Sequence, residues 1–330
     1  MNKANRKFSM WKGKIPTKAV IYVGLIIILF VLPLVTRSPY YLHILILTFI
    51  YIIATSSLRT IAISGQLSLG HAGFMSIGAY VSAVLAKELG WTPWLTIPLG
   101  GLATAAVAVL IGYPFSRLRS IYFSMVSLFF GVAILAVNAT LSDYTGGAVG
   151  LIAIPPLFAS SKLPYYYFCF VLLLLSLLAL RRFEVCRIGM TVKTVAQSHW
   201  VASSVGIDES NYRVLALAVG CFFVGIAGAV YAHYNLVLSP NGFNLLASIN
   251  LVIYMFVGGM GSFFGPLIGT ATLIIIPELF RGIKEFVPYI YSGIMLIVIF
   301  LMPQGIASLL GQVKFWVANV RERKTVRHAS

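Results

Sequence analysis

Polar residues that could do chemistry gather in one stretch of an otherwise apolar sequence, TIAISGQLSLGHAGFMSIGAYVS at 60–82. Hydrocarbon offers backbone groups no hydrogen bonds, so a glycine-rich polar break survives in a bilayer only where protein buries it or where it lines a cavity. Transporters often place substrate groups at such breaks, at mid-membrane depth. We therefore predict that this break lines a substrate pathway formed by Ser64, Gly65, Gln66, Ser68, Gly70, His71 and Gly73.

The break also has a purely structural interpretation, in which small residues such as Gly70, Gly73 and Gly78 only let helices pack closely. Gln66 and His71 fit that interpretation less well, because polar side chains in membrane helices face the bundle interior and form hydrogen bonds there. We expect His71 to be a hydrogen-bonded interior residue. Whether Gln66 contacts substrate stays open.

Other kinds of chemistry lack residues at suitable spacing. The sequence has no paired-carboxylate, Ser-His-Asp or HExxH arrangement and no paired metal ligands, so it predicts no enzyme, no cofactor and no metal site. The glycine-rich stretch at 257–269 lacks the Gly-Lys-Ser/Thr of a phosphate loop and favours a closely packed helical hairpin. An ion-coupled carrier needs embedded carboxylates, and only Glu278 qualifies, so the energy source is expected to be external.

The elements that must position the break are membrane helices. Apolar residues make up 59% of the 330 residues, charged residues 10%, and the mean hydropathy is +0.94. A soluble domain carries about a quarter charged residues. The continuous apolar runs predict an all-α integral membrane bundle of about ten transmembrane helices. The expected spans are roughly 19–36, 40–58, 62–86, 93–116, 120–140, 164–181, 212–234, 245–260, 263–281 and 286–302.

The distribution of basic residues predicts the orientation. With ten spans, most of the 24 Lys and Arg residues fall in loops on the side of the N-terminus, which the positive-inside rule makes cytoplasmic. This placement argues against nucleic acid as the partner of the basic residues. Both termini are then cytoplasmic, with a basic N-terminus at 1–18, one transmembrane domain at 19–302 and a basic tail at 303–330. The first span is expected to be uncleaved.

Two loops are longer than ordinary connections. The outer loop 141–163 contains glycines and paired prolines, which favour a defined re-entrant or surface path. The inner loop 182–211 lacks Gly and Pro over 190–205 and predicts about four helical turns there, ended by Gly206. Asp208 or Ser210 can cap the next helix. Spacing leaves open whether the loop helix lies on anionic lipid or docks a cytoplasmic protein.

A set of motifs carries a family resemblance. GQLSLGHAGFMSIGAY, TGGAVGL, RIGMTVKTVAQSHWVASSVGID, YRVLALAVGCFFVGIAGAVYAHY and FVGGMGSFFGPLIGT follow one another in this order. Together they resemble the LivM-type membrane permease of bacterial branched-chain (hydrophobic) amino acid ABC importers, over residues 40–305. The same family includes urea and amide permeases. An ATP-independent secondary carrier is the alternative from outside the family.

The resemblance implies a bacterial cytoplasmic (inner) membrane location and four kinds of partner. These are a second, LivH-like permease subunit, two cytoplasmic ATP-binding subunits, an extracytoplasmic substrate-binding protein and membrane lipid. It extends the expected substrate pathway to Thr145, Gly146 and Gly147. It also assigns ATPase coupling to Arg187, Lys193, Ser198, His199, Trp200, Ser203, Gly206 and Asp208. Relatives commonly carry acidic residues where this chain has His199 and Ser203, so the expected docking contacts differ here.

Overall fold

The structure, a computed structural model, describes residues 24, 27–33, 38–118, 120–158, 162–204, 206–280, 287–302 and 305–307. Over these residues it is helical, and one isolated bridge joins Leu151 to Leu238. The predicted first span lies mostly outside the described residues. The helices are α2 (Pro39–Ala62), α3 (His71–Glu88), α4 (Pro93–Ser116), α5 (Ser120–Thr140), α6 (Ser142–Thr145), α7 (Lys162–Val185), α8 (Arg187–Gln197), α9 (His199–Ser204), α10 (Glu209–Asn235), η1 (Pro240–Phe243), α11 (Leu245–Gly258), α12 (Gly265–Leu279) and α13 (Val287–Leu301).

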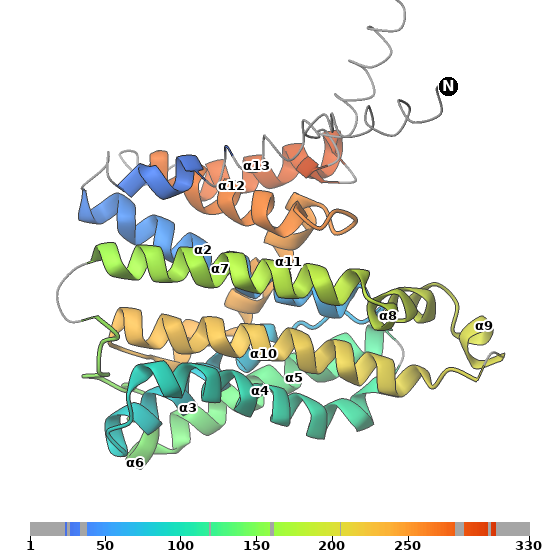
Figure 1. Cartoon of the computed structure of the whole chain (residues 1–330), viewed down its shortest axis with the longest axis horizontal. Helices are drawn as coiled ribbons and strands as arrows, with labels where there is room; N and C mark the ends of the chain where they lie inside the picture. The colour runs from blue at the N-terminus through green and yellow to red at the C-terminus, as the bar shows by residue number, and fades with distance from the viewer. Residues whose placement is uncertain are drawn as a thin grey trace, which may run out of the picture.

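The long helices lie side by side, with α8 and α9 at one end of the bundle and α6 at the other (Figure 1). We refer to these as the α8 end and the α6 end. Helix α10 packs on α2, α3 and α4. No soluble domain interrupts the described ranges, in agreement with the uniform composition.

The centre of the bundle depends on glycines that let backbones approach closely. A Cβ at Gly228 of α10 would lie 2.0 Å from Met75 O of α3, and a Cβ at Gly78 of α3 would lie 2.3 Å from Gly225 O. Lipid is as apolar as a leucine side chain, so close packing rather than hydrophobic burial drives helix association in a membrane. These contacts fix α3 against α10 and thereby set where α3 begins.

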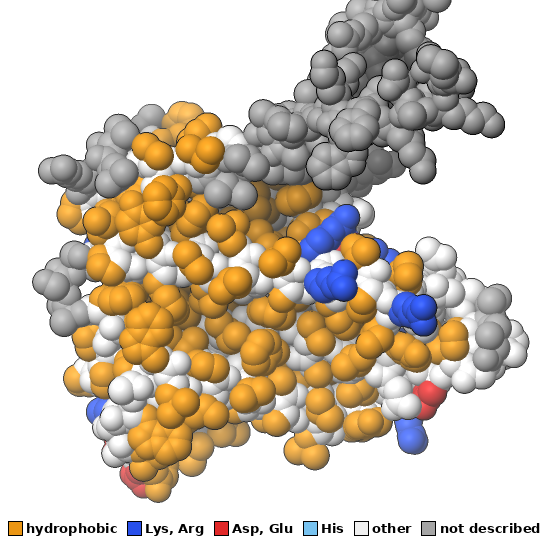
Figure 2. Space-filling view, in the orientation of Figure 1, with side chains coloured by type: hydrophobic (Ala, Val, Ile, Leu, Met, Phe, Trp, Pro, Cys, Tyr) orange, Lys and Arg blue, Asp and Glu red, His pale blue; other side chains and the backbone are white. Residues whose placement is uncertain are grey.

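Six helices in the described part of the chain are long and apolar enough to cross a membrane. They are α2, α4, α5, α7, α10 and the segment Pro240–Gly258. Apolar side chains cover the face over α4, α7 and α10, and most Lys and Arg side chains visible on that face lie toward the α8 end (Figure 2). The expected total of about ten spans and the cytoplasmic location of both termini stay predictions.

Several predicted boundaries are confirmed, and two are wrong. The spans 93–116 and 120–140 coincide with α4 and α5. The closely packed hairpin at 257–269 is also confirmed, because α11 ends at Gly258, α12 begins at Gly265, and a Cβ added at Gly258 would lie only 1.8 Å from Gly265 O. The span 62–86 is wrong at its start, since eight non-helical residues precede α3. The single helix over 190–205 is also wrong, because Ser198 is extended (φ −156°, ψ 104°) and separates α8 from α9.

Candidate functional site

The polar break is the connection between α2 and α3, at the α8 end of the bundle. Backbone hydrogen bonds continue for three residues beyond α2, and Gly65 then takes a left-handed conformation (φ 83°) that ends the turn. The next residues are non-helical until His71 starts α3, whose N-cap is Gly70. The break therefore separates two helices rather than interrupting one.

Helix α5 supports the break through small residues and serine hydroxyls. A Cβ at Gly70 would lie 1.8 Å from Ser127 O, so only glycine allows this contact. Ser127 Oγ accepts a hydrogen bond from Leu69 N at 3.0 Å, and Ser124 Oγ donates to Leu67 O at 2.7 Å. Gly73 packs in the same way on Gly131, because a Cβ added at Gly73 would lie 2.7 Å from Gly131 Cα.

His71 forms the interior hydrogen bond that we expected. Its Nε2 lies 2.9 Å from Ser57 Oγ, and Ser57 Oγ donates its proton to Ala54 O at 2.7 Å. With the Ser57 proton on Ala54 O, Nε2 of His71 would donate to Ser57 and Nδ1 would remain an acceptor. Ser64 is likewise satisfied, since its hydroxyl donates to Ile61 O at 2.7 Å.

The break also buries polar atoms that have no hydrogen-bond partner among the described residues. They are both side-chain atoms of Gln66, the hydroxyl of Ser68 and Nδ1 of His71, and each of these residues is at most 1% exposed. An unpaired buried polar group costs about 1–3 kcal/mol. These groups together offer an amide donor, two acceptors and a hydroxyl, all uncharged, to a small polar molecule.

The loop expected to couple to an ATPase forms α8, Ser198, α9 and the turn before α10. Gly206 is exposed and left-handed (φ 79°), and it ends the loop helix as predicted. Asp208 is the N-cap of α10 and accepts from Ser210 N at 3.0 Å, which confirms the predicted cap. Arg187 and Ser203 are exposed, and the side chains of His199 and Trp200 lie outside the described residues.

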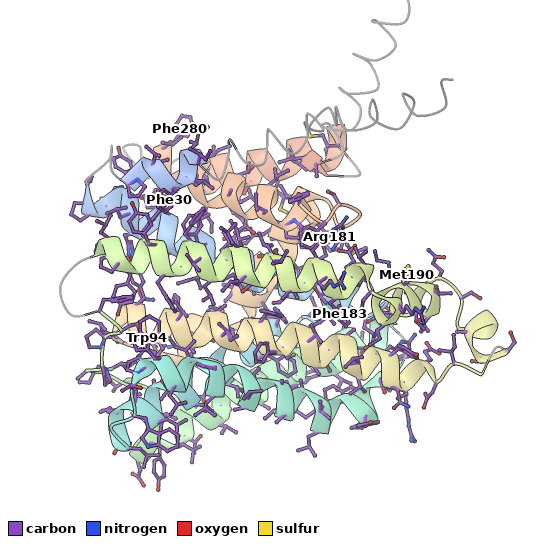
Figure 3. All side chains as sticks on the ribbon, in the orientation of Figure 1. Phe30, Trp94, Arg181, Phe183, Met190 and Phe280 are labelled. Atoms are coloured by element: carbon purple, nitrogen blue, oxygen red, sulfur yellow. The ribbon has the colours of Figure 1, made fainter. Side chains whose placement is uncertain are left out.

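The break and α8 are in contact. A Cβ at Gly65 would lie 3.4 Å from the Cβ of Ala196, so the turn after α2 rests on α8. The structure thus brings together two groups of residues that are more than a hundred positions apart in sequence. Met190, exposed on α8, and Arg181, near the end of α7, lie at this end, whereas Trp94 lies at the opposite end (Figure 3).

Residues 145–147 lie at the α6 end, away from the break. Thr145 Oγ1 donates toward Asn138 O at 2.6 Å and Leu141 O at 2.5 Å, and it accepts from Gly147 N at 3.3 Å. Gly146 is left-handed (φ 73°) and caps α6. The α3–α5 contact lies between the two predicted parts of the pathway, and in it Asn138 Nδ2 donates to Ser76 Oγ at 3.3 Å.

Sequence reasoning missed a buried ion cluster beside the break. Arg59 forms two hydrogen bonds to the Glu184 carboxylate, at 3.0 and 3.1 Å, and Lys193 Nζ forms a third at 2.7 Å. The side chains of Arg59 and Glu184 are 5% and 6% exposed. Arg59 falls between the expected spans 40–58 and 62–86, but it lies inside α2. An arginine so close to an apolar span was the available signal, since such residues are costly in a membrane and mark function.

These features define a multi-pass membrane protein with a polar break buried at one end of its bundle. Residues 40–303 match the family described as the permease component of branched-chain amino acid transport systems, and the chain belongs to that family.

Individual relatives agree with this assignment. The high-affinity branched-chain amino acid transport system permease protein LivM of Salmonella typhimurium is 30% identical over 294 residues, covering 80% of this chain and 69% of the relative. The corresponding LivH protein of Escherichia coli is 23% identical, covering 77% and 90%. The guanosine ABC transporter permease protein NupQ of Bacillus subtilis is 26% identical, covering 61% and 72%. Comparison with solved structures gave no significant match.

Proposed function

We propose that this chain is a membrane permease subunit of an ABC importer and that its substrates are branched-chain or other hydrophobic amino acids. The observation that carries the proposal is the match of the permease family over residues 40–303. The uncharged polar atoms of the break support it, because they can bind a small molecule that carries no net charge. ATP hydrolysis belongs to partner subunits, since the sequence lacks a Walker-type loop.

The α8 end is the cytoplasmic end in this proposal, and the chain crosses the inner membrane about ten times with both termini inside. The segments 1–18 and 303–330 are then cytoplasmic, and 19–302 is the permease domain. The partners are a LivH-like second permease, two ATP-binding subunits and an extracytoplasmic binding protein. Exposed Met190, Thr194 and Gln197 recur at helical spacing on the outer face of α8, which suits docking of an ATP-binding subunit.

The break supplies the inner part of the route. Its extended backbone and the amide of Gln66 can meet a substrate carboxylate, as broken helices do in other transporters. Closure of the ATP-binding subunits moves α8, and the contact of Ala196 with Gly65 passes this movement to the break. The bundle then alternates between outward and inward access. Urea and amides have the same uncharged chemistry, so they are the competing substrates.

Reconstitution tests this function. The chain is purified with its second permease and ATP-binding subunits, placed in proteoliposomes and supplied with the binding protein and radiolabelled leucine. We expect uptake that requires ATP and the binding protein. Uptake of urea or an amide in place of leucine would favour the alternative substrate class. Uptake by this chain alone, without ATP, would show a secondary carrier and contradict the proposal.

Cysteine cross-linking tests the docking surface. The three native cysteines, Cys169, Cys186 and Cys221, are first replaced by alanine or serine. We expect Ser198→Cys, at the junction of α8 and α9, to form an adduct with an ATP-binding subunit in the assembled complex. Ser142→Cys, exposed at the α6 end, is the matched control and should form none. A complex that hydrolyses ATP but yields no Ser198 adduct would overturn this docking site.

A further inference from the structure

The ion cluster around Glu184 joins four separate parts of the chain. Arg59 belongs to α2, Glu184 to the last turn of α7 and Lys193 to α8. Arg59 Nε also donates to Met260 O at 2.9 Å, in the turn between α11 and α12. The guanidinium groups of Arg59 and Arg181 both lie over the ring of Phe263 in that turn, at 5.7 and 5.2 Å from its centroid. The Glu184 carboxylate therefore joins α2, α7 and α8, and its partner Arg59 adds the α11–α12 turn.

Helix α8 reaches this cluster through one face. Gly189, Lys193 and Ala196 are spaced i, i+4 and i+7, so they lie in a row along the helix. A Cβ at Gly189 would lie 2.1 Å from Phe183 O of α7. Lys193 binds Glu184, and Ala196 contacts Gly65 of the break. We call this row the inner face of α8. It is the surface through which α8 meets α7, the cluster and the break.

Arg59 and Ser57 both lie in the last two turns of α2, and Ser57 holds the first residue of α3 through its hydrogen bond to His71. A helix moves as a rigid unit over so short a distance. Any displacement of Arg59 therefore also displaces Ser57, and with it the α3 side of the break.

Glu184 pairs with three cations, of which Arg181 is the most distant at 3.8 Å. The two hydrogen-bonded links, to Arg59 and Lys193, differ in strength. Arg59 binds both carboxylate oxygens in a forked arrangement and is buried, so that link is rigid and directional. Lys193 binds one oxygen through a flexible chain, and its side chain is 41% exposed. Arg59 and Glu184 can therefore stay paired while Lys193 alone releases and rebinds. The Arg59–Glu184 pair is therefore suited to hold α2 and α7 together, while the Lys193–Glu184 contact is suited to change as α8 moves.

On the basis of the proposed function, we propose that Glu184 and Lys193 are positioning residues that pass movement of α8 to the polar break. The Arg59–Glu184 pair is the pivot that joins α2 to α7. The Lys193–Glu184 contact is the connection that moves with the ATP-binding subunits. Neither residue contacts substrate in this assignment, and the effect of each on transport acts through α2 and the position of His71.

Lys193→Gln tests the connection without disturbing the pivot, because it leaves the Arg59–Glu184 pair intact. Leucine uptake and ATP hydrolysis are measured in the same proteoliposomes for the complete complex. We expect uptake per ATP hydrolysed to fall at least about fivefold, with hydrolysis and assembly retained, as for loss of a coupling interaction. Lys193→Arg should restore most of the ratio, because it keeps the charge. Arg117→Gln, exposed at the end of α4, removes an equal charge and should leave the ratio unchanged.

Three results would overturn this inference. They are an unchanged uptake per ATP in Lys193→Gln, a parallel loss of uptake and hydrolysis that leaves the ratio unchanged, and failure of the variant to assemble, which would show a purely structural role. A wild-type complex without ATP-dependent uptake is a different result. It would contradict the proposed function itself, and the inference would fall with it.

Discussion

The two polar segments at opposite ends of the α3–α5 pair differ in how their polar groups are satisfied. At the α6 end the polar groups are paired. Thr145 Oγ1 shares its one proton between Asn138 O and Leu141 O and accepts from Gly147 N, and Leu151 and Leu238 exchange backbone hydrogen bonds of 2.8 Å in both directions. At the α8 end, Gln66 and Ser68 are buried without partners among the described residues. One segment has the hydrogen bonding of a fixed structure, and the other keeps unused hydrogen-bonding capacity.

In our proposal this difference marks the break as the segment that works in transport. An unpaired buried polar atom costs about 1–3 kcal/mol, and we propose that the atoms of the break find partners in another state. At the break, that state is one with a substrate, a water molecule or a rearranged helix. The paired segment at the α6 end has no such need, because its hydrogen bonds already hold it. The sequence predicts that both segments line the pathway, and we propose that the α6 segment is its fixed, structural part.

The largest loss of stability is expected when the Arg59–Glu184 pair next to the polar break is removed. Arg59→Ala leaves the buried Glu184 carboxylate with two more exposed partners, Lys193 at 2.7 Å and Arg181 at 3.8 Å, and we expect a loss of about 3–5 kcal/mol in the free energy of unfolding. Thermal unfolding of the purified protein measures it. Arg182→Ala, at an exposed position in the last turn of α7, is the control and should change stability by less than about 0.5 kcal/mol. Equal effects of the two variants would refute a special role for Arg59.

The second-largest loss of stability is expected at the α6 end, and it tests whether the loop there is rigid. Gly150 is left-handed (φ 92°), and a Cβ there would lie 2.0 Å from Leu238 O. Gly150→Ala should therefore destabilise the protein by about 1–3 kcal/mol through backbone strain and a forced separation. Gly242→Ala, where nothing lies within 4 Å of the added carbon, is the matched control. If the Gly150 variant were as stable as its control, the loop would be able to change conformation at little cost in free energy, and it would not be rigid.

A smaller effect is expected when the paired side chain at the α6 end is removed. Thr145→Val keeps the shape of the side chain and loses its hydrogen bonds, so we expect destabilisation of about 1–2 kcal/mol. Thr140→Val is the control on the same end of the bundle, because Thr140 is exposed and bonds only its own helix, at Ala136 O. If the Thr145 variant were no less stable than the Thr140 variant, the comparison between the two segments would lose its basis.

The smallest effect on stability is expected at the break. Gln66→Leu replaces a buried amide that has no partner among the described residues, so the free energy of unfolding should stay within about 1 kcal/mol of wild type or improve. Chemical denaturation of the purified protein in mild detergent provides the measurement. Destabilisation by more than about 2 kcal/mol would mean that the amide is paired in the folded protein, contrary to our interpretation of the break.

Sequence alone predicted the helices well, because long apolar runs carry that information locally. The spans that became α4 and α5 agree with the structure, and so does the hairpin at 257–269. The start of α3 was wrong because Ile63, Leu67 and Leu69 continue the apolar run, whereas the contacts with α5 that accompany the non-helical backbone are tertiary. The pairing of Arg59 with Glu184 joins residues 125 positions apart, which no local pattern reveals.

The central claim is that the break works in transport while the α6 segment is structural. Leucine uptake per ATP is measured for the Gln66→Leu and Thr145→Val complexes, at a temperature where both are folded. We predict a fall of about tenfold or more for Gln66→Leu, as for loss of one hydrogen bond to substrate, and a value within about threefold of wild type for Thr145→Val. Normal uptake by the Gln66 variant, with uptake lost in the Thr145 variant, would contradict the claim.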